Sequence, residues 1–138
     1  MIEIKRILVG YDGSEPAAHA VRAAAAYAQA YSADLTVLTA ADRLIRPDGH
    51  KTLAADENEA HETANHGAHL AGEAGAADPR TVVSLLAPAN ALAQEAVNGG
   101  YDLVVVGHRG VSGLRSLLMG SVAKSVVEKV HCSVLVVR

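Results

Sequence analysis

The sequence contains no phenylalanine and no tryptophan, and four tyrosines make up its whole complement of these large aromatic residues. Proteins that hold single-stranded nucleic acid stack its bases on aromatic side chains, so this composition argues against that function. The formal net charge is -3 at pH 7, whereas binding to a duplex needs a broad basic surface. We therefore expect no nucleic-acid partner.

Cysteine and long apolar runs are scarce as well. Cys132 is the single cysteine, which excludes an internal disulfide and, by itself, a structural zinc site. Residues 1–10 lack the length and cleavage pattern of a signal peptide. No uninterrupted apolar run reaches the roughly 18 residues of a membrane-spanning helix. These absences predict a soluble, cytoplasmic protein that does not associate with a membrane.

What remains is the composition of a globular protein. Half of the 138 residues are hydrophobic and 20% are charged. A chain of this length is the usual size of one domain and can bury a substantial core. We expect residues 1–138 to form one domain.

Short apolar runs alternate with helical patterns along the chain. Five apolar, mostly β-branched runs predict strands at residues 4–9, 34–40, 81–86, 103–106 and 133–137. Helices are expected between them, after a capping Ser14, over residues 52–75, from Pro88 to Gly99, and through residues 122–130. This alternation predicts a doubly wound α/β fold, a five-stranded parallel sheet with four helices on its two faces.

Two further expectations concern burial. The continuous apolar runs at residues 103–106 and 133–137 favour central or well-covered strands. In the first and last helices, apolar residues recur at helical spacing and are expected to face the sheet. These residues are Ala17, Val21, Ala24, Ala28 and Tyr31 in the first, and Val122, Val126, Val127 and Val130 in the last.

The long connection after the fourth strand, residues 107–121, is the segment most suggestive of chemistry. Gly107 and Gly110 let the backbone approach a ligand closely. Gly120 and Ser121 begin the last helix, whose free amides and dipole attract anions, and the serine hydroxyl is a further donor. The pattern is neither the dinucleotide G-x-G-x-x-G nor a Walker motif. From the residues alone, glycines that merely end a strand and cap a helix remain an alternative.

The spacing Gly107-x2-Gly110-x9-Gly120-Ser121 resembles the G-x2-G-x9-G-[ST] nucleotide motif of universal stress proteins. The segments RILVGYDGS, LVVVG and CSVLVV resemble the same family in the same order, so the resemblance covers nearly the whole chain. It implies an adenine nucleotide alpha-hydrolase-like arrangement of the sheet. It also implies ATP, or AMP or ADP, with Mg²⁺ or Mn²⁺, bound at the carboxyl ends of the strands.

The resemblance carries particular roles over to this chain. Asp12 is implied to lie near the phosphates or their metal, beside Tyr11 in the same turn, and the Ala40 backbone is implied to contact adenine. The motif would surround the ribose and phosphates with Gly107, Gly110, Gly120, Ser121 and the Val122 amide. His108 and Arg109 stand between the first two glycines and are expected to contact the ligand for that reason. Relatives commonly form dimers through the last strand, so a homodimer through residues 134–137 is implied. Ser133 stands where the family often has proline, which bears only on the entry to that strand.

Several residues also have plainer interpretations. Asp12 suits an ordinary turn in which its carboxylate bonds to nearby backbone. His61, His66 and His69 are not spaced to lie on one helical face, so we interpret them as part of a solvated helix and not as a metal site. Cys132 is interpreted as a small apolar residue.

Three functions remain in competition. No nucleophile elbow or paired base is readable, so no catalytic residue is assigned and an enzyme is the less favoured alternative. The favoured interpretation is a stress-response module that signals nucleotide occupancy to a partner. A slow ATPase or autophosphorylating enzyme using Asp12 and a metal is the second, and a nucleotide-free interaction protein of the same fold is the third.

Overall fold

The computed structural model describes residues 3–41, 53–108 and 119–138. Its five strands are all parallel and lie in the order β3-β2-β1-β4-β5. The strands are β1 (Arg6–Gly10), β2 (Asp34–Ala40), β3 (Arg80–Ser84), β4 (Leu103–Gly107) and β5 (Ser133–Val137). The parallel α/β sheet expected from the sequence is confirmed.

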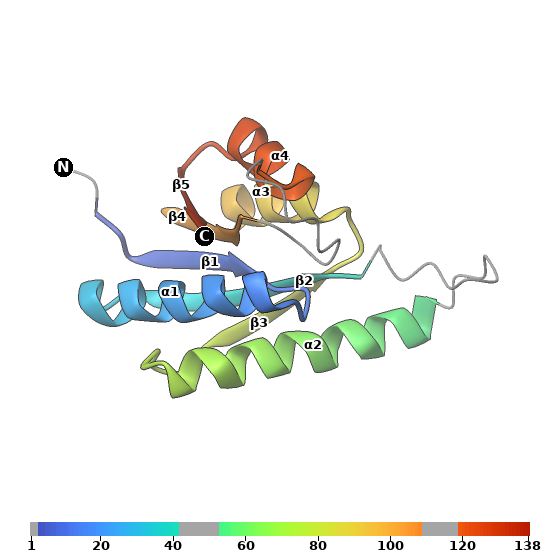
Figure 1. Cartoon of the computed structure of the whole chain (residues 1–138), viewed down its shortest axis with the longest axis horizontal. Coiled ribbons are helices and arrows are strands. Elements are labelled where there is room, and N and C mark those ends of the chain that lie inside the picture. Colours follow the sequence, from blue (N-terminus) through green and yellow to red (C-terminus); the bar gives the residue numbers. More distant parts are fainter. Residues whose placement is uncertain (1–2, 42–52, 109–118) are drawn as a thin grey trace.

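Four helices cover the two faces of this sheet, as expected. They are α1 (Glu15–Tyr31), α2 (Leu53–Glu73), α3 (Pro88–Asn98) and α4 (Ser121–Lys129). Figure 1 shows α1 and α2 on one face and α3 and α4 on the other. Helix α2 packs on β2 and β3, so it covers the β3 edge of the sheet. No helix in the described ranges is both long and apolar enough to cross a membrane.

The middle of β1 is apolar because both of its faces are covered. Ile7, Leu8 and Val9 are all fully buried. Successive side chains point to opposite faces, so Ile7 and Val9 join the core under α1 and α2 while Leu8 joins the core under α3. This part of β1 therefore carries no alternating polar residues.

Two helical residues do not lie where the sequence pattern places them. Tyr31, expected to face the sheet, is 53% exposed and stacks on Tyr27 one turn earlier on the outer side of α1, with ring centroids 6.1 Å apart. Val127 is 50% exposed, whereas Val126 is fully buried. One residue is a 100° step around a helix, so neighbouring valines cannot both face the sheet.

Two strand expectations also need correction. β3 ends at Ser84 instead of residue 86, because the Ser84 hydroxyl accepts a hydrogen bond from the Leu86 amide at 3.2 Å and turns the chain. Leu85 and Leu86 consequently lie outside the strand and are exposed. β5 is an edge strand with half-buried side chains, so the expectation of a central or well-covered strand is wrong for it. Its apolar run reflects partial cover from α1 and α4.

Candidate functional site

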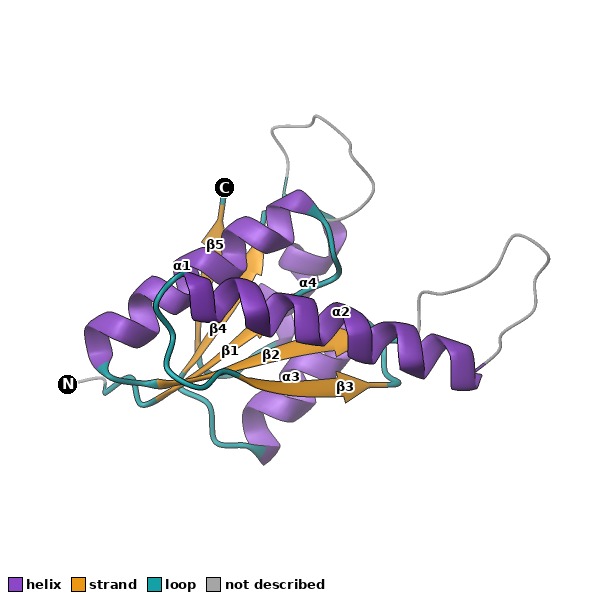
Figure 2. Ribbon diagram, turned by 90° about the horizontal axis from the view of Figure 1, so that it is seen from below, coloured by secondary structure: helices purple, strands orange, loops and turns teal. Residues whose placement is uncertain are grey.

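The topology creates a switch point between the carboxyl ends of β1 and β4. These strands are neighbours in the sheet, but the chain leaves β1 for α1 on one face and reaches α4, on the other face, after β4. Figure 2 shows the strands between α1 and α2 in front and the paler α3 and α4 behind. Ligands of doubly wound folds bind at such switch points, because the connecting loops part there.

The β1 side of this switch point begins with Tyr11. The residue is only 4% exposed and belongs to the core under α1 and α2, so its phenol ring is not available to a ligand. Burial, reinforced by the nearby carboxylates of Asp12 and Glu15, raises the pKa of the Tyr11 phenol. The phenol therefore stays protonated and forms a hydrogen bond with His66 Nδ1 of α2 at 2.7 Å.

Asp12 is exposed and forms the turn into α1. Its Oδ1 accepts hydrogen bonds from the Ser14 amide at 2.9 Å and the Ser14 hydroxyl at 2.5 Å. Ser14 in turn caps α1 by accepting from the Ala17 amide at 3.3 Å. The plainer turn-forming role is thus present, and it uses one of the two carboxylate oxygens. Within the described ranges, no group of three or more metal-ligating side chains is found.

The β4 side brings the two ends of the long connection together. The His108 amide donates to the Val137 carbonyl at 2.7 Å, which extends the β4–β5 ladder by one residue beyond Gly107. The His108 carbonyl then accepts from the Gly120 amide at 2.8 Å. This bond sets the first turn of α4 directly beside the end of β4.

Among the described residues, the N-terminus of α4 has no side-chain cap. Gly120 occupies the N-cap position and, having no side chain, provides no capping hydrogen bond. The first hydrogen bond of the helix is from the Lys124 amide to the Gly120 carbonyl, so the Ser121, Val122 and Ala123 amides lack helical acceptors. No acidic residue lies in the first turn of α4.

The N-terminus of α1 has the opposite character. It is already capped by Ser14 and carries the carboxylates of Asp12 and Glu15. A phosphate group is therefore favoured at α4 and disfavoured at α1, whereas a cation is favoured beside Asp12.

Ala40, at the end of β2, has backbone groups without a partner among the described residues. Its pairing partner in β3 is Ser84, and it is the next residue, Ala41, whose amide donates to the Ser84 carbonyl at 2.8 Å. Amides and carbonyls alternate in direction along a parallel strand, so those of Ala40 point toward β1. β1 ends at Gly10, and within the described chain the Ala40 amide and carbonyl have no hydrogen-bond partner.

The structure thus gathers most of the expected residues at one edge of the sheet. Tyr11, Asp12, Ala40, Gly107, His108, Gly120, Ser121 and Val122 all lie at the carboxyl ends of the strands or at the start of α4. Arg109 and Gly110 fall outside the described residues. The sequence did not indicate Thr39 and His66, which bond to Tyr11. Gly67, in the middle of α2, was the one local sign of close packing there.

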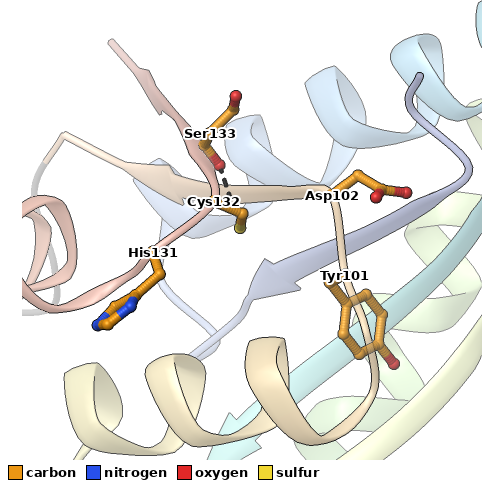
Figure 3. A pocket seen from close by; sticks show the side chains of 5 residues that line it. All are labelled: Tyr101, Asp102, His131, Cys132 and Ser133. Atoms are coloured by element: carbon orange, nitrogen blue, oxygen red, sulfur yellow. Dashed lines mark hydrogen bonds between the residues drawn. The ribbon is translucent and has the colours of Figure 1, made fainter. Parts of the chain in front are cut away.

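A concavity lies at the opposite, amino-terminal edge of the sheet. It is an open depression of about 480 Å³ lined by Tyr101, Asp102, His131, Cys132 and Ser133. Asp102 Oδ2 already accepts hydrogen bonds from the Lys5 and Arg6 amides, and Figure 3 shows the His131 ring pointing away from Asp102. Burial raises the pKa of the Cys132 thiol, which keeps it protonated and weakly nucleophilic. Asp102 thus links the start of β1 to the start of β4. The five lining residues form no reactive cluster.

Comparison with known proteins agrees with this geometry. Residues 3–138 match the model of the Universal stress protein family. The chain is 36% identical over 140 residues to a universal stress protein of Thermus aquaticus, covering 97% of this chain and 98% of that one. A solved universal stress protein, UspA from Lactobacillus plantarum, superimposes with a TM-score of 0.82 at 25% identity and 99% coverage of both chains. A universal stress protein solved in complex with cAMP has a TM-score of 0.76 and 27% identity, with 99% of this chain and 98% of that chain covered.

Proposed function

The chain belongs to the universal stress protein family, and on that basis we propose that it binds an adenine nucleotide between the carboxyl ends of β1 and β4. Its role would be that of a stress-response module whose nucleotide occupancy is signalled to a partner. ATP is the proposed ligand, with AMP and ADP as related ones.

The uncapped N-terminus of α4 is the observation that carries the proposal. Three amides without helical acceptors, at the positive end of a helix dipole, suit phosphate oxygens. The bond between Gly120 and His108 fixes that helix end at the switch point of the sheet. Gly107, Ser121 and Val122 lie next to the start of α4. Arg109 and Gly110 are included in the proposed site only because they belong to the sequence motif.

We assign the adenine base to the end of β2 and the metal ion to the turn after β1. The free amide and carbonyl of Ala40 can pair with the donor and acceptor edge of adenine. The cAMP complex of a relative supports an adenine ligand in this fold. We assign Mg²⁺ or Mn²⁺ to the nucleotide phosphates with Asp12 as its protein ligand, because Asp12 Oδ2 has no partner within the described ranges.

Thermal unfolding with and without nucleotide tests this function. Millimolar ATP with Mg²⁺ should raise the unfolding midpoint by several degrees, because a ligand at about 100 times its Kd stabilises a protein by roughly 2.7 kcal/mol. AMP should also stabilise the protein. GTP should stabilise it less if the Ala40 backbone pairs with the adenine base. If none of the three nucleotides moves the midpoint, the interaction-protein alternative replaces nucleotide binding.

We further propose a homodimer formed through β5. This edge strand presents backbone groups on one side that no strand in the described part of the chain occupies, and its valines are half-buried. Such an edge is suited to pairing across a two-fold axis. Light scattering at micromolar concentration should give twice the chain mass of 14.2 kDa. A monomeric mass under these conditions would remove the dimer from the proposal.

We place the protein in the cytoplasm as part of this proposal. The net charge of -3 and the lack of phenylalanine and tryptophan continue to argue against nucleic acid as a partner.

A further inference from the structure

Tyr11 is fixed by hydrogen bonds at every polar group it carries. Its amide donates to the Leu38 carbonyl at 2.9 Å, and its carbonyl accepts from the Thr39 hydroxyl at 2.8 Å. Its phenol and His66 Nδ1 lie 2.7 Å apart. Two of these bonds come from β2 and the third from α2, so Tyr11 joins three elements at the carboxyl end of β1.

Helix α2 lies unusually close to this residue. A Cβ atom on Gly67 would stand 2.8 Å from Tyr11 Cδ2, so only glycine permits the observed approach of the helix to the ring. One turn earlier, Thr63 Cγ2 lies 3.8 Å from the Cβ position of Gly13, whose φ of +88° belongs to the turn after β1. α2 therefore flanks both Tyr11 and the turn that follows it.

The turn itself is held at its two ends. At the α1 end, Asp12 Oδ1 bonds to the Ser14 amide and hydroxyl. At the β1 end, the Tyr11 backbone is held by β2 and the Tyr11 side chain by His66. Asp12 and Gly13, between these two anchors, are exposed.

We propose that His66 is a positioning residue of the nucleotide site, acting through Tyr11 on the turn that carries Asp12. This inference rests on the proposed function, since it assigns a role to a residue behind that site. Without the bond to His66, the Tyr11 side chain loses the one polar anchor that it has among the described residues, and the turn adopts the binding geometry for a smaller share of the time. Apparent affinity falls in proportion to that share.

Nucleotide affinity of matched variants tests the inference. We expect His66→Ala to weaken ATP–Mg²⁺ binding about three- to tenfold in isothermal titration calorimetry, the size expected for one partly exposed hydrogen bond. Tyr11→Phe should give a similar loss, and the double variant should be no worse than either single one. His66→Asn should recover most of the affinity, because an asparagine amide places a polar atom where Nδ1 lies.

His69→Ala is the control for removing a histidine from the same helix. Its imidazole makes only an exposed pair with Glu73 at 3.1 Å, so binding should match that of the unaltered protein. Wild-type affinity in both His66→Ala and Tyr11→Phe would overturn the positioning role while leaving nucleotide binding in place. An asparagine variant as weak as the alanine variant would overturn it too. If the unaltered protein itself binds no nucleotide, it is the proposed function that fails.

Discussion

Replacing Gly120 by aspartate should abolish nucleotide binding without destabilising the fold. At the N-cap position an aspartate side chain accepts hydrogen bonds from the same free amides that we assign to phosphate. It also places a negative charge where the ligand carries its own, and such a like-charge contact costs several kcal/mol. We expect affinity for ATP–Mg²⁺ to fall by about 100-fold or more, equivalent to about 2.7 kcal/mol or more.

The same change should leave stability equal or higher. Aspartate is a slightly better N-cap than glycine, and a negative charge at a helix N-terminus contributes about 0.3–1 kcal/mol. The unfolding midpoint of the ligand-free protein should thus stay constant or rise by up to about 4 °C. Calorimetric titration and thermal unfolding of the same preparation measure the two effects, which are expected to run in opposite directions.

Ala87→Asp is the matched control. Ala87 is the exposed N-cap residue of α3 and makes no side-chain capping bond, so an aspartate there adds the same charge and the same kind of cap to another helix. This variant should gain stability and keep its nucleotide affinity. If Gly120→Asp binds ATP as well as Ala87→Asp does, phosphate does not bind at the start of α4.

Gly67→Ala should cause the largest loss of stability among conservative changes in α2. The new methyl group would stand 2.8 Å from Tyr11 Cδ2 and 2.9 Å from Val37 Cγ1, and both neighbours are buried. Overpacking of this kind typically costs about 1–3 kcal/mol, which outweighs the gain of up to about 1 kcal/mol from the better helix propensity of alanine. We expect the unfolding midpoint to fall by about 3–8 °C.

Gly72→Ala provides the comparison in the same helix. Nothing lies within 4 Å of the Cβ position of Gly72, so only the propensity gain remains and the midpoint should rise slightly. Thermal and urea unfolding followed by circular dichroism compare the two variants directly. Equal stability of Gly67→Ala and Gly72→Ala would show that α2 does not sit as closely on Tyr11 as described.

Local patterns in the sequence predicted the elements well, and they failed where a contact outside the element decided the outcome. The apolar run at residues 103–106 and that at 133–137 look alike, yet one forms the buried strand β4 and the other the edge strand β5. Tyr31 fits the apolar face of its helix, but it stacks on Tyr27 on the outer side. Periodicity describes one element, whereas burial depends on its neighbours.

The candidate site also has one part that the sequence predicted and one part that it did not. The glycine and serine at positions 120 and 121 signal a helix start within a few residues of sequence, so the beginning of α4 was predictable. The partners of Tyr11 were not, because the bond between Tyr11 and His66 spans 55 residues of sequence. A contact that distant is created only when α2 docks on the sheet over β2 and β3.

By itself, the sequence determined the succession of strands and helices and the residue types that follow each strand, because both are set by interactions between near neighbours along the chain. The tertiary structure alone decided the strand order, which makes β1 and β4 adjacent and places Asp12 and the start of α4 on the two sides of one switch point. It also decided that α2 closes on Tyr11 through Gly67 and His66. Strand order and helix docking depend on which apolar faces bury one another most completely, and that is a property of the whole chain.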